Sequence, residues 1–152
     1  MIEFKDFTFQ YAESTAPTLH DINLTLAPGT FLGITGAAGS GKSTLTYAFN
    51  GIIPHCYPGD FYGSVHVCGL DTDLTSISRL VGSVCQDIDS QMVSSVVEDE
   101  ILYGLENFGV PKDQIEHRLA ASLEAMGIES LRDRTIDSLS GGQKQKVALA
   151  SI

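Results

Sequence analysis

The sequence predicts an α/β protein whose β-rich part covers residues 1–90 and whose helical part covers residues 91–140. Three observations support this fold class. The first third of the chain alternates apolar and polar residues with the period of two that half-buried strands show. The second half repeats its apolar residues at helical spacing, and a glycine-rich stretch follows an apolar run in the first half. With 152 residues, 43% of them hydrophobic, the chain suits a single domain.

Alternating and apolar segments predict the strands in order. Residues 7–11 and 22–26 alternate strictly and are expected to bury one face each. The run Phe31–Thr35 is more continuously apolar, as a strand buried on both faces would be. Residues 65–67 predict another strand, and Leu80–Cys85 predicts a further buried one.

Helix signals dominate the second half of the chain. The tetrapeptide Ser95–Glu98 has the pattern of a capping box, and apolar residues recur at helical spacing over residues 97–105. Pro111 fits the first position of a second helix, whose apolar stripe runs over residues 115–126. Gly127 fits the position that ends this helix.

Composition argues against several classes of function. Nineteen acidic against nine basic side chains give a net charge of −10, which argues against a nucleic-acid partner. No stretch approaches the roughly 18 apolar residues of a membrane helix, and the start MIEFKDFTFQ lacks the features of a secretion signal. The three cysteines lack C-x-x-C spacing, which predicts reduced thiols in the cytosol. The four histidines lack the spacing of a structural zinc site.

The stretch Gly36–Thr44, with the sequence GAAGSGKST, satisfies the P-loop pattern between a predicted strand and a predicted helix. Gly39 and Gly41 leave room for phosphate oxygens, and successive N–H groups at the helix start form an anion cradle. Lys42 is expected to reach the β- and γ-phosphates, and the Ser43 hydroxyl to bind Mg²⁺. The alternative is a glycine turn that caps a helix, with Lys42 as a solvated charge. The predicted nucleotide-binding residues of the loop are Gly36, Gly39, Ser40, Gly41, Lys42, Ser43 and Thr44.

A second glycine-rich feature opens the stretch LSGGQKQKVALASI. Ser140 and Gln143 form a predicted capping box. A capping box does not explain Gly141 and Gly142, since each glycine costs about 1 kcal/mol relative to alanine in a helix. Glycines at a helix N-terminus indicate a backbone that a ligand approaches closely, and an anion is the obvious candidate. The helix over residues 141–152 is predicted to bury an apolar face that includes Val147, Leu149 and Ile152.

The motif LSGGQKQK, about 100 residues after the P-loop, resembles the signature motif of ATP-binding-cassette (ABC) ATPases. The resemblance covers essentially the whole chain. It implies a P-loop NTPase fold with an N-terminal antiparallel β part, a RecA-like parallel sheet core and a helical subdomain. It also implies that ATP and Mg²⁺ bind in a head-to-tail pair of ATPase subunits, each signature capping the γ-phosphate on the other's P-loop. The capping residues would be Ser140, Gly141, Gly142 and Gln143.

Two further residues match the family pattern. Tyr11, in the sequence FQY, lies where the family places an aromatic ring that stacks on adenine; the alternative is an ordinary tyrosine at a strand end. Gln86 matches the Q-loop glutamine, which contacts Mg²⁺ and the attacking water; the alternative is an ordinary loop residue. The resemblance therefore implies Lys42 and Gln86 as catalytic groups, and Ser43 and Gln86 as metal-binding groups.

The stretches NGIIPHCYPGDFYGSVHVCGLDT and VCQDIDSQMVSSVVEDEILYGLENFGVP resemble the ATPase subunits of energy-coupling-factor importers, which take up vitamins and transition-metal ions. The subgroup usually has asparagine-proline-aspartate after the Q-loop glutamine, whereas this chain has Asp87-Ile88-Asp89. The subgroup implies a transmembrane importer subunit as partner and a peripheral position on the cytoplasmic face of the membrane. We expect the partner to dock on the helical part, where acidic residues are dense; the alternative is an ordinary solvated face. These acidic residues are Asp87, Asp89, Glu98, Asp99 and Glu100.

The ABC family has further elements after the signature helix. They are a strand ending in a metal-binding aspartate, an adjacent catalytic glutamate and a later histidine, and the sequence ends at Ile152 before them. We therefore expect a C-terminally incomplete fold that leaves apolar surface uncovered, binds ATP weakly and hydrolyses it negligibly. Alternatives are a regulatory nucleotide-binding module and a soluble ABC protein of translation or DNA repair; a P-loop kinase fits least, since nothing in it requires LSGGQ. The sequence does not name the transported substrate.

Overall fold

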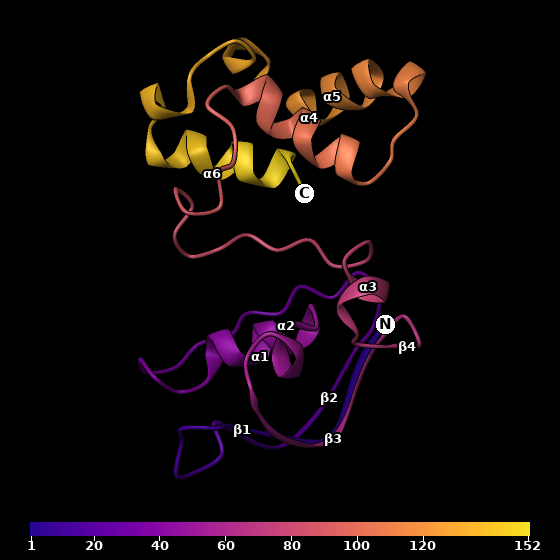
Figure 1. Ribbon diagram of the computed structural model, residues 1–152, viewed down its shortest axis with the longest axis vertical. Helices are drawn as coiled ribbons and strands as arrows, with labels where there is room; N and C mark the ends of the chain where they lie inside the picture. The colour runs from indigo at the N-terminus through magenta and orange to yellow at the C-terminus, as the bar shows by residue number, and fades with distance from the viewer. The chain divides into compact units, whose positions relative to one another are not determined.

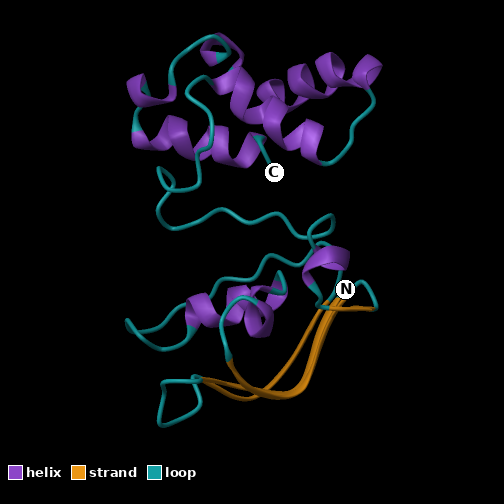
Figure 2. Ribbon diagram, in the orientation of Figure 1, coloured by secondary structure: helices purple, strands orange, loops and turns teal.

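The N-terminal strands form an antiparallel sheet in the order β2-β1-β3-β4 (Figures 1 and 2). This is seen in a computed structural model that describes the backbone of residues 1–152 and every side chain except that of Thr75. The strands predicted over residues 7–11, 22–26 and 65–67 are confirmed. The elements are β1 (Ile2–Tyr11), β2 (Leu19–Leu26), β3 (Gly59–Val67) and β4 (Leu70–Asp71).

A β-bulge in β1 sets which side chains reach the core. The register between β1 and β3 slips between Lys5 and Thr8, and Asp6 has a φ of 48°. Because the bulge adds one residue, the buried positions change from Phe4 to Phe7 and Phe9. These three rings form the centre of the core of this part of the chain.

Short helices cover the sheet in the first 82 residues. They are α1 (Lys42–Phe49), α2 (Ile52–His55) and α3 (Leu74–Ile77). Ala48 of α1 and Ile53 of α2 are fully buried among the phenylalanine rings of β1. The ring of Phe49 meets that of Phe4 edge to face, with the centroids 5.1 Å apart. Packing against β1 therefore fixes the helix that follows the glycine-rich loop.

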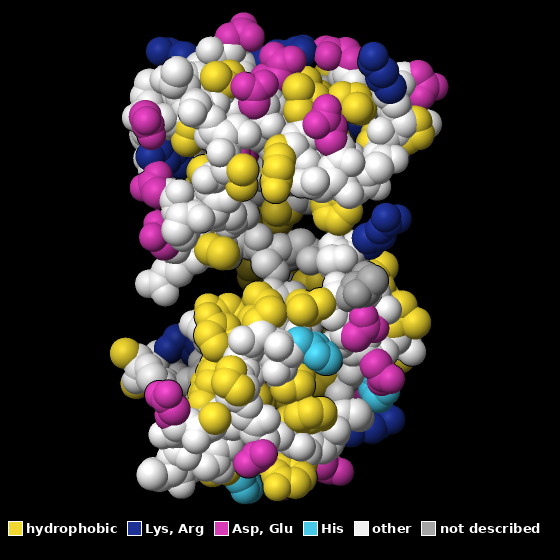
Figure 3. Space-filling model, in the orientation of Figure 1, with side chains coloured by type: hydrophobic (Ala, Val, Ile, Leu, Met, Phe, Trp, Pro, Cys, Tyr) yellow, Lys and Arg dark blue, Asp and Glu magenta, His cyan; other side chains and the backbone are white. Residues whose placement is uncertain are grey.

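Two predicted strands are absent from the structure. Residues 31–35 and 80–85 lie outside the strands of the described chain, and the parallel sheet expected from them is not formed there. Hydrophobic side chains are visible on the surface of the first unit (Figure 3). Phe31 is 99% exposed, and Leu80 and Val84 are also exposed, so the expectation of burial is wrong. The reason is that an apolar segment becomes a buried strand only when neighbouring strands supply its hydrogen bonds and cover its faces.

The helical part contains three longer helices and its own core. They are α4 (Val97–Asn107), α5 (Lys112–Met126) and α6 (Gly141–Ala150). The chain divides into two compact units, Met1–Gly82 and Ser83–Ile152. The boundary predicted from the sequence lies at residue 90, and the structure includes residues 83–90 in the helical unit. The core of the second unit consists of Val97, Ile101, Leu119, Leu123, Ile128, Leu131, Ile136, Leu139, Val147 and Ala150.

The start of α4 differs from the predicted capping box at Ser95–Glu98. The helix begins at Val97, and no side chain caps it. Instead, the N–H of Val97 donates to the carbonyl of Arg134 at 3.1 Å, and that of Glu98 donates to the carbonyl of Arg132 at 3.0 Å. Backbone oxygens from the segment before α6 therefore supply the acceptors that a capping side chain would otherwise provide.

The predicted end of α5 is confirmed. Gly127 has a φ of 60°, which glycine adopts without strain. Its N–H donates to the carbonyl of Glu124, and the N–H of Ile128 donates to that of Leu123, both at 3.0 Å. This is the Schellman arrangement, in which the buried side chains of Ile128 and Leu123 also share one core. Pro111, expected at the first helical position, lies immediately before it.

The apolar face of α6 differs in part from the prediction. Val147 is fully buried as expected, and Ala148 and Ala150 are buried beside it. Leu149 is 49% exposed, and Ile152, which lies beyond the end of α6 at Ala150, is also 49% exposed, so their predicted burial is wrong. Successive residues of a helix are rotated by about 100°, which turns Leu149 away from the face that Val147 and Ala150 share.

Candidate functional site

The glycine-rich loop leads directly into α1, and two glycines set its path. Gly39 has a φ of 77°, and Gly41, which precedes the helix, has a φ of 88°. Both values lie in the left-handed region that glycine enters without strain. Gly41 is also required by close approach, because a Cβ there would lie 2.9 Å from the carbonyl oxygen of Thr18. The loop is thus built from residues that admit a close backbone approach.

A hollow of about 250 Å³ opens at the start of α1. The first intrahelical hydrogen bond runs from the N–H of Leu45 to the carbonyl of Gly41. The first three N–H groups of α1 therefore have no acceptor within the helix. Such groups at a helix N-terminus attract anions. None of the residues that line the hollow is acidic. They are Thr18, Gly39, Gly41, Lys42, Ser43 and Thr44.

The ammonium of Lys42 lies within the loop. It donates to the carbonyl oxygens of Gly36 at 2.9 Å and Ala37 at 2.7 Å, and lies 3.5 Å from the Ser40 hydroxyl. These partners are uncharged, and Lys42 makes no ion pair among the side chains that the structure describes. A positive charge held by neutral oxygens at a helix N-terminus is a site that a phosphate group would fit.

Tyr11 lies beside this hollow. Its hydroxyl and that of Thr44 are 3.1 Å apart, and Thr44 is buried at the start of α1. The ring of Tyr11 meets the buried ring of Phe9 edge to face at 4.9 Å. The structure therefore brings Tyr11 together with the loop residues, across 33 positions of sequence.

At the start of α6 the predicted capping box is confirmed. The N–H of Ser140 donates to the Gln143 side-chain oxygen at 2.9 Å, and the N–H of Gln143 donates to the Ser140 hydroxyl at 3.4 Å. A Cβ at Gly141 or Gly142 would meet no atom within 4 Å. The packing of this chain therefore gives no reason for the glycine pair. A hollow of about 330 Å³ lies here, lined in part by Ser140, Gly142, Gln143 and Lys146.

Gln86 is exposed in a loop of the second unit, whereas the P-loop belongs to the first. The side-chain amide of Gln91 stabilises this loop through two hydrogen bonds to the backbone. Its oxygen accepts from the N–H of Cys85 at 2.7 Å, and its nitrogen donates to the carbonyl of Ser83 at 3.3 Å. The sequence does not indicate this role of Gln91, because a side-chain hydrogen bond to a backbone several residues away leaves no periodic signal.

An ion pair joins the same loop to α6. The Lys144 ammonium lies 2.5 Å from a carboxylate oxygen of Asp89, and only 17% of the Lys144 side chain is exposed. The hydrogen bond to Asp89 raises the pKa of Lys144, so the amine stays charged. The segment after Gln86 and the start of α6 are therefore linked within the second unit.

The predicted acidic docking surface is wrong for Glu100. Glu100 is only 4% exposed, and its carboxylate accepts from the N–H groups of Val93 at 2.9 Å and Ser94 at 2.7 Å. It organises the turn before α4. Glu98 binds the guanidinium of Arg132 through two hydrogen bonds of 3.0 and 2.8 Å. Among the other acidic residues of that prediction, Asp87 and Asp99 are exposed and Asp89 pairs with α6.

Over the described part of the chain, no helix is both long enough and apolar enough to cross a bilayer. Among the described side chains, no group of three or more histidine, cysteine, aspartate or glutamate residues is placed to hold a metal ion. Three hydroxyl-bearing residues, Thr18, Ser43 and Thr44, line the hollow at the start of α1, and hydroxyl oxygens suit a hard cation such as Mg²⁺.

Residues 19–152 match the ABC transporter family. The chain belongs to this family of ATP-binding domains. A putative ABC transporter ATP-binding protein of Pyrococcus horikoshii is 41% identical over 155 residues, covering 100% of this chain and 55% of the relative. The corresponding protein of Pyrococcus abyssi is also 41% identical, with the same coverage. This ABC chain thus spans about half the length of the curated relatives it matches.

Solved structures confirm the predicted fold class. CbiO1 from Clostridium perfringens, described as part of the ABC transporter complex cbiONQ, superimposes with a TM-score of 0.85 at 31% identity, covering 99% of this chain and 59% of that one. The ATP-binding subunit of another ABC transporter gives a TM-score of 0.77 at 19% identity and shows the fold alone, covering 99% of this chain and 60% of that one. The predicted P-loop NTPase fold is therefore correct, although residues 31–35 and 80–85 form no strand in this ABC chain.

Proposed function

We propose that this chain is the nucleotide-binding portion of an ABC importer ATPase. In this proposal, the loop Gly36–Thr44 binds the β- and γ-phosphates of ATP. The observation that carries it is the Lys42 ammonium, held by neutral carbonyl oxygens at the N-terminus of α1. An incoming phosphate replaces these weak acceptors with charged ones and adds hydrogen bonds from the helix N–H groups.

The proposal gives each side chain of the loop a separate role. Lys42 neutralises charge on the phosphates, and Ser43, which lines the hollow, contributes its hydroxyl oxygen to Mg²⁺. The bound ion supplies charge neutralisation at the phosphate oxygens. Tyr11, whose hydroxyl contacts that of Thr44, is proposed to contact the adenosine part of the ligand. Gln86 is proposed to contact Mg²⁺ and the attacking water.

A second ATPase subunit completes the proposed site. The open space around Gly141 and Gly142 supports close approach of a partner's γ-phosphate to the start of α6. The capping box holds Ser140 and Gln143 at that opening. We propose a head-to-tail pair, in which each signature helix closes the P-loop of the other subunit.

Importer function and a peripheral position on the cytoplasmic face of the membrane are part of the same proposal. They are supported by the likeness to cbiO1, which is described as part of the complex cbiONQ. An energy-coupling-factor type of importer is the subgroup that this likeness favours. Co-purification with membrane subunits encoded beside the gene tests this point, and isolation with ribosomes or DNA instead would contradict it. The net charge of −10 leaves nucleic acid outside the proposed partners.

A narrower function is supported by the composition of the phosphate hollow. Its lining includes no carboxylate that could activate water. We therefore propose that this 152-residue chain, taken by itself, binds ATP without turning it over at a measurable rate.

Titration of ATP into the chain, with release of inorganic phosphate measured in parallel, tests these statements. Lys42→Ala is expected to weaken ATP binding by at least about tenfold, because the phosphates lose their charged partner. Lys5→Ala is the matched control, since Lys5 is an exposed lysine of the same unit that pairs with Glu3. Equal affinities of the wild-type chain and Lys42→Ala would refute the phosphate site, and phosphate release abolished by Lys42→Ala would refute the absence of turnover.

A further inference from the structure

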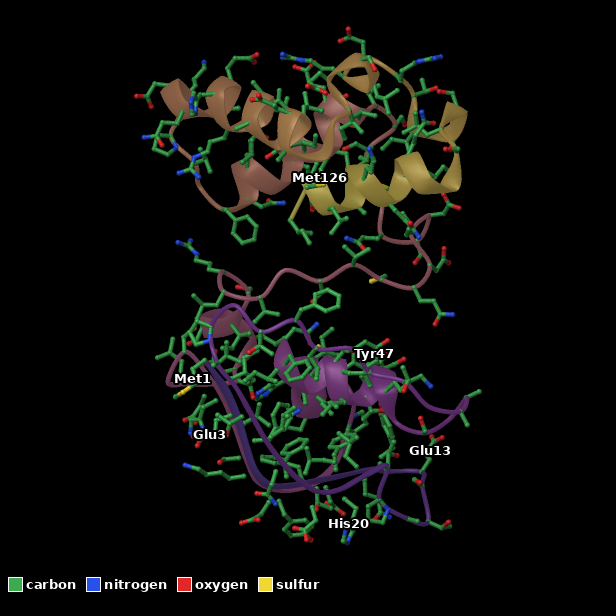
Figure 4. All side chains as sticks on the ribbon, turned by 180° about the vertical axis from the view of Figure 1, so that it is seen from behind. Met1, Glu3, Glu13, His20, Tyr47 and Met126 are labelled. Atoms are coloured by element: carbon green, nitrogen blue, oxygen red, sulfur yellow. The ribbon has the colours of Figure 1, made fainter. Side chains whose placement is uncertain are left out.

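Three tyrosines form a group beside the phosphate hollow, here called the tyrosine cluster: Tyr11, Tyr47 and Tyr57. The rings of Tyr47 and Tyr57 stack with centroids 5.7 Å apart and an interplanar angle of 16°. The ring of Tyr57 meets that of Tyr11 at 6.0 Å and 83°. Figure 4 marks Tyr47 on α1, and the Tyr11 hydroxyl reaches Thr44 on the same helix. The cluster therefore contacts the glycine-rich loop Gly36–Thr44 through Tyr11.

Tyr57 differs from the other two members in its relation to the core. Tyr11 and Tyr47 are partly buried and pack against the phenylalanine core, whereas Tyr57 is 44% exposed and lies outside that core. A large aromatic ring that faces solvent and contributes little to the core is free to contact a ligand. Burial therefore accounts for Tyr11 and Tyr47 but not for Tyr57.

The backbone holds Tyr57 in a defined place. The N–H of Ala12 donates to the carbonyl of Pro58 at 3.1 Å, and Tyr11 pairs with Gly59 in the sheet. A Cβ at Gly59 would lie 2.3 Å from the carbonyl oxygen of Gln10, so glycine is what permits this close pairing. Tyr57 is thus carried beside Tyr11 on a fixed segment.

We propose that Tyr57 is a second base-binding residue: the flat face of the purine stacks on the Tyr57 ring, and the edge of the purine meets Tyr11, whose ring stands at 83° to that of Tyr57. This rests on the proposed function, in which the P-loop holds the phosphates. The order of the side chains supports it: Thr44 lines the phosphate hollow, the Tyr11 hydroxyl touches Thr44, and Tyr57 touches the Tyr11 ring. A nucleotide has the same order, with phosphates, then ribose, then base.

Stacking is the interaction that such a residue supplies. The flat face of a purine gains dispersion and desolvation energy on an aromatic ring, with little dependence on the identity of the base. The ring of Tyr57 is braced by Tyr47, so little side-chain entropy is lost when the base binds. The hydroxyl of Tyr57 has no part in the proposal, and phenylalanine is expected to replace it.

The test compares ATP with inorganic tripolyphosphate, which has the phosphates but no base, on the whole 152-residue chain. Tyr57→Ala is expected to weaken ATP binding by about tenfold and to leave tripolyphosphate binding unchanged, while Tyr57→Phe restores the ATP affinity. The chain has no tryptophan, so Tyr57→Trp also provides a single fluorescent reporter. Its emission is expected to change with ATP but not with tripolyphosphate. Tyr62→Trp, on an exposed residue of β3 that pairs with Thr8, is the control that should stay silent.

Different outcomes separate the inference from the proposed function. If the wild-type chain binds neither ATP nor tripolyphosphate, the proposed function is wrong and the inference fails with it. If ATP and tripolyphosphate weaken equally in Tyr57→Ala, Tyr57 acts on the fold of the loop and base stacking is refuted. If Tyr11→Ala alone weakens ATP binding and Tyr57→Ala changes nothing, the base contacts Tyr11 only and the second base-binding residue is refuted.

Discussion

At the scale of single residues, glycines occur at both proposed phosphate contacts, but the structure explains them differently. Gly41 is required by this chain itself, because its φ is 88° and a neighbouring carbonyl leaves no room for a Cβ. Gly141 and Gly142 meet nothing within 4 Å, so their own chain would accept alanine. A residue that lowers helix stability without a packing reason points to a ligand from outside. In this chain that ligand is the proposed γ-phosphate of a partner subunit.

The residue-scale prediction concerns Gly142→Ala. Alanine is the better helix former, so the free energy of unfolding is expected to rise by up to about 1 kcal/mol. The new methyl group blocks close approach, so ATP-dependent association of two chains is expected to weaken. Urea unfolding and sedimentation with and without ATP measure the two effects. Gly104→Ala is the opposite control, since its Cβ would lie within 2.4 Å of the Ser151 carbonyl oxygen and should destabilise the chain. A loss of stability in Gly142→Ala would contradict the argument.

At the scale of elements, features that depend on residues close together in the sequence can be predicted, whereas features that depend on distant residues cannot. The alternation of β1 and β2 and the caps of α5 and α6 depend on residues close together, and these predictions are confirmed. The start of α4 was mispredicted because its acceptors come from residues 132–134, which no local pattern announces. The segment Phe31–Thr35 was predicted as a strand from its apolar run, but a strand depends on neighbours that lie elsewhere in the sequence.

The same distinction holds for the candidate site. The P-loop is one continuous motif, so its glycines and Lys42 could be found from sequence alone. The contact between Tyr11 and Thr44 spans 33 positions, and the pairing of Tyr57 with Tyr11 depends on the register of β1 with β3. Neither leaves a local signal, although the family pattern indicated Tyr11. The sequence does not indicate Tyr57, because its position beside Tyr11 depends on the pairing of β1 with β3.

The element-scale prediction concerns Arg132, which ties the segment before α6 to α4 and α5. Its guanidinium binds Glu98 and Glu116 with hydrogen bonds of 2.7–3.0 Å. These bonds hold the pKa of both carboxyls below the ordinary value of 4.5. A lowered carboxyl pKa in the folded state stabilises the fold at pH values above the unfolded-state pKa. That stabilisation is lost as the pH falls through the lowered, folded-state pKa.

Arg132→Met is therefore expected to destabilise the chain at pH 7 and to have progressively less effect as the pH falls below about 4.5. Urea unfolding of wild type and variant at a series of pH values gives the difference directly. Arg118→Met, on an exposed arginine of α5, should show no such trend. A difference between wild type and Arg132→Met that stays constant down to pH 3 would show that Arg132 acts through packing rather than through its carboxylate partners.

At the scale of the whole molecule, the described side chains form two hydrophobic cores that share no residue. Phe4, Phe7 and Phe9 form the centre of one, and the buried residues of α4, α5 and α6 form the other. The P-loop and the tyrosine cluster belong to the first unit, and the Gln86 loop and the signature helix belong to the second. Each unit therefore contains some of the residues that are proposed to contact a nucleotide, and each set is supported by a separate hydrophobic core.

Because the two cores are separate, a substitution that destabilises one core is expected to leave the other intact. Ile101 is 1% exposed in the second core, and Ile101→Ala is expected to remove about 2–5 kcal/mol from the stability of that unit. Amide hydrogen exchange should accelerate across residues 83–152 and stay unchanged in β1, β3 and α1, while tripolyphosphate binding at the P-loop keeps its affinity. Leu149→Ala, at a half-exposed position of α6, is the control and should leave exchange nearly unaltered. Faster exchange throughout both units in Ile101→Ala would show instead that the two cores unfold as one cooperative structure.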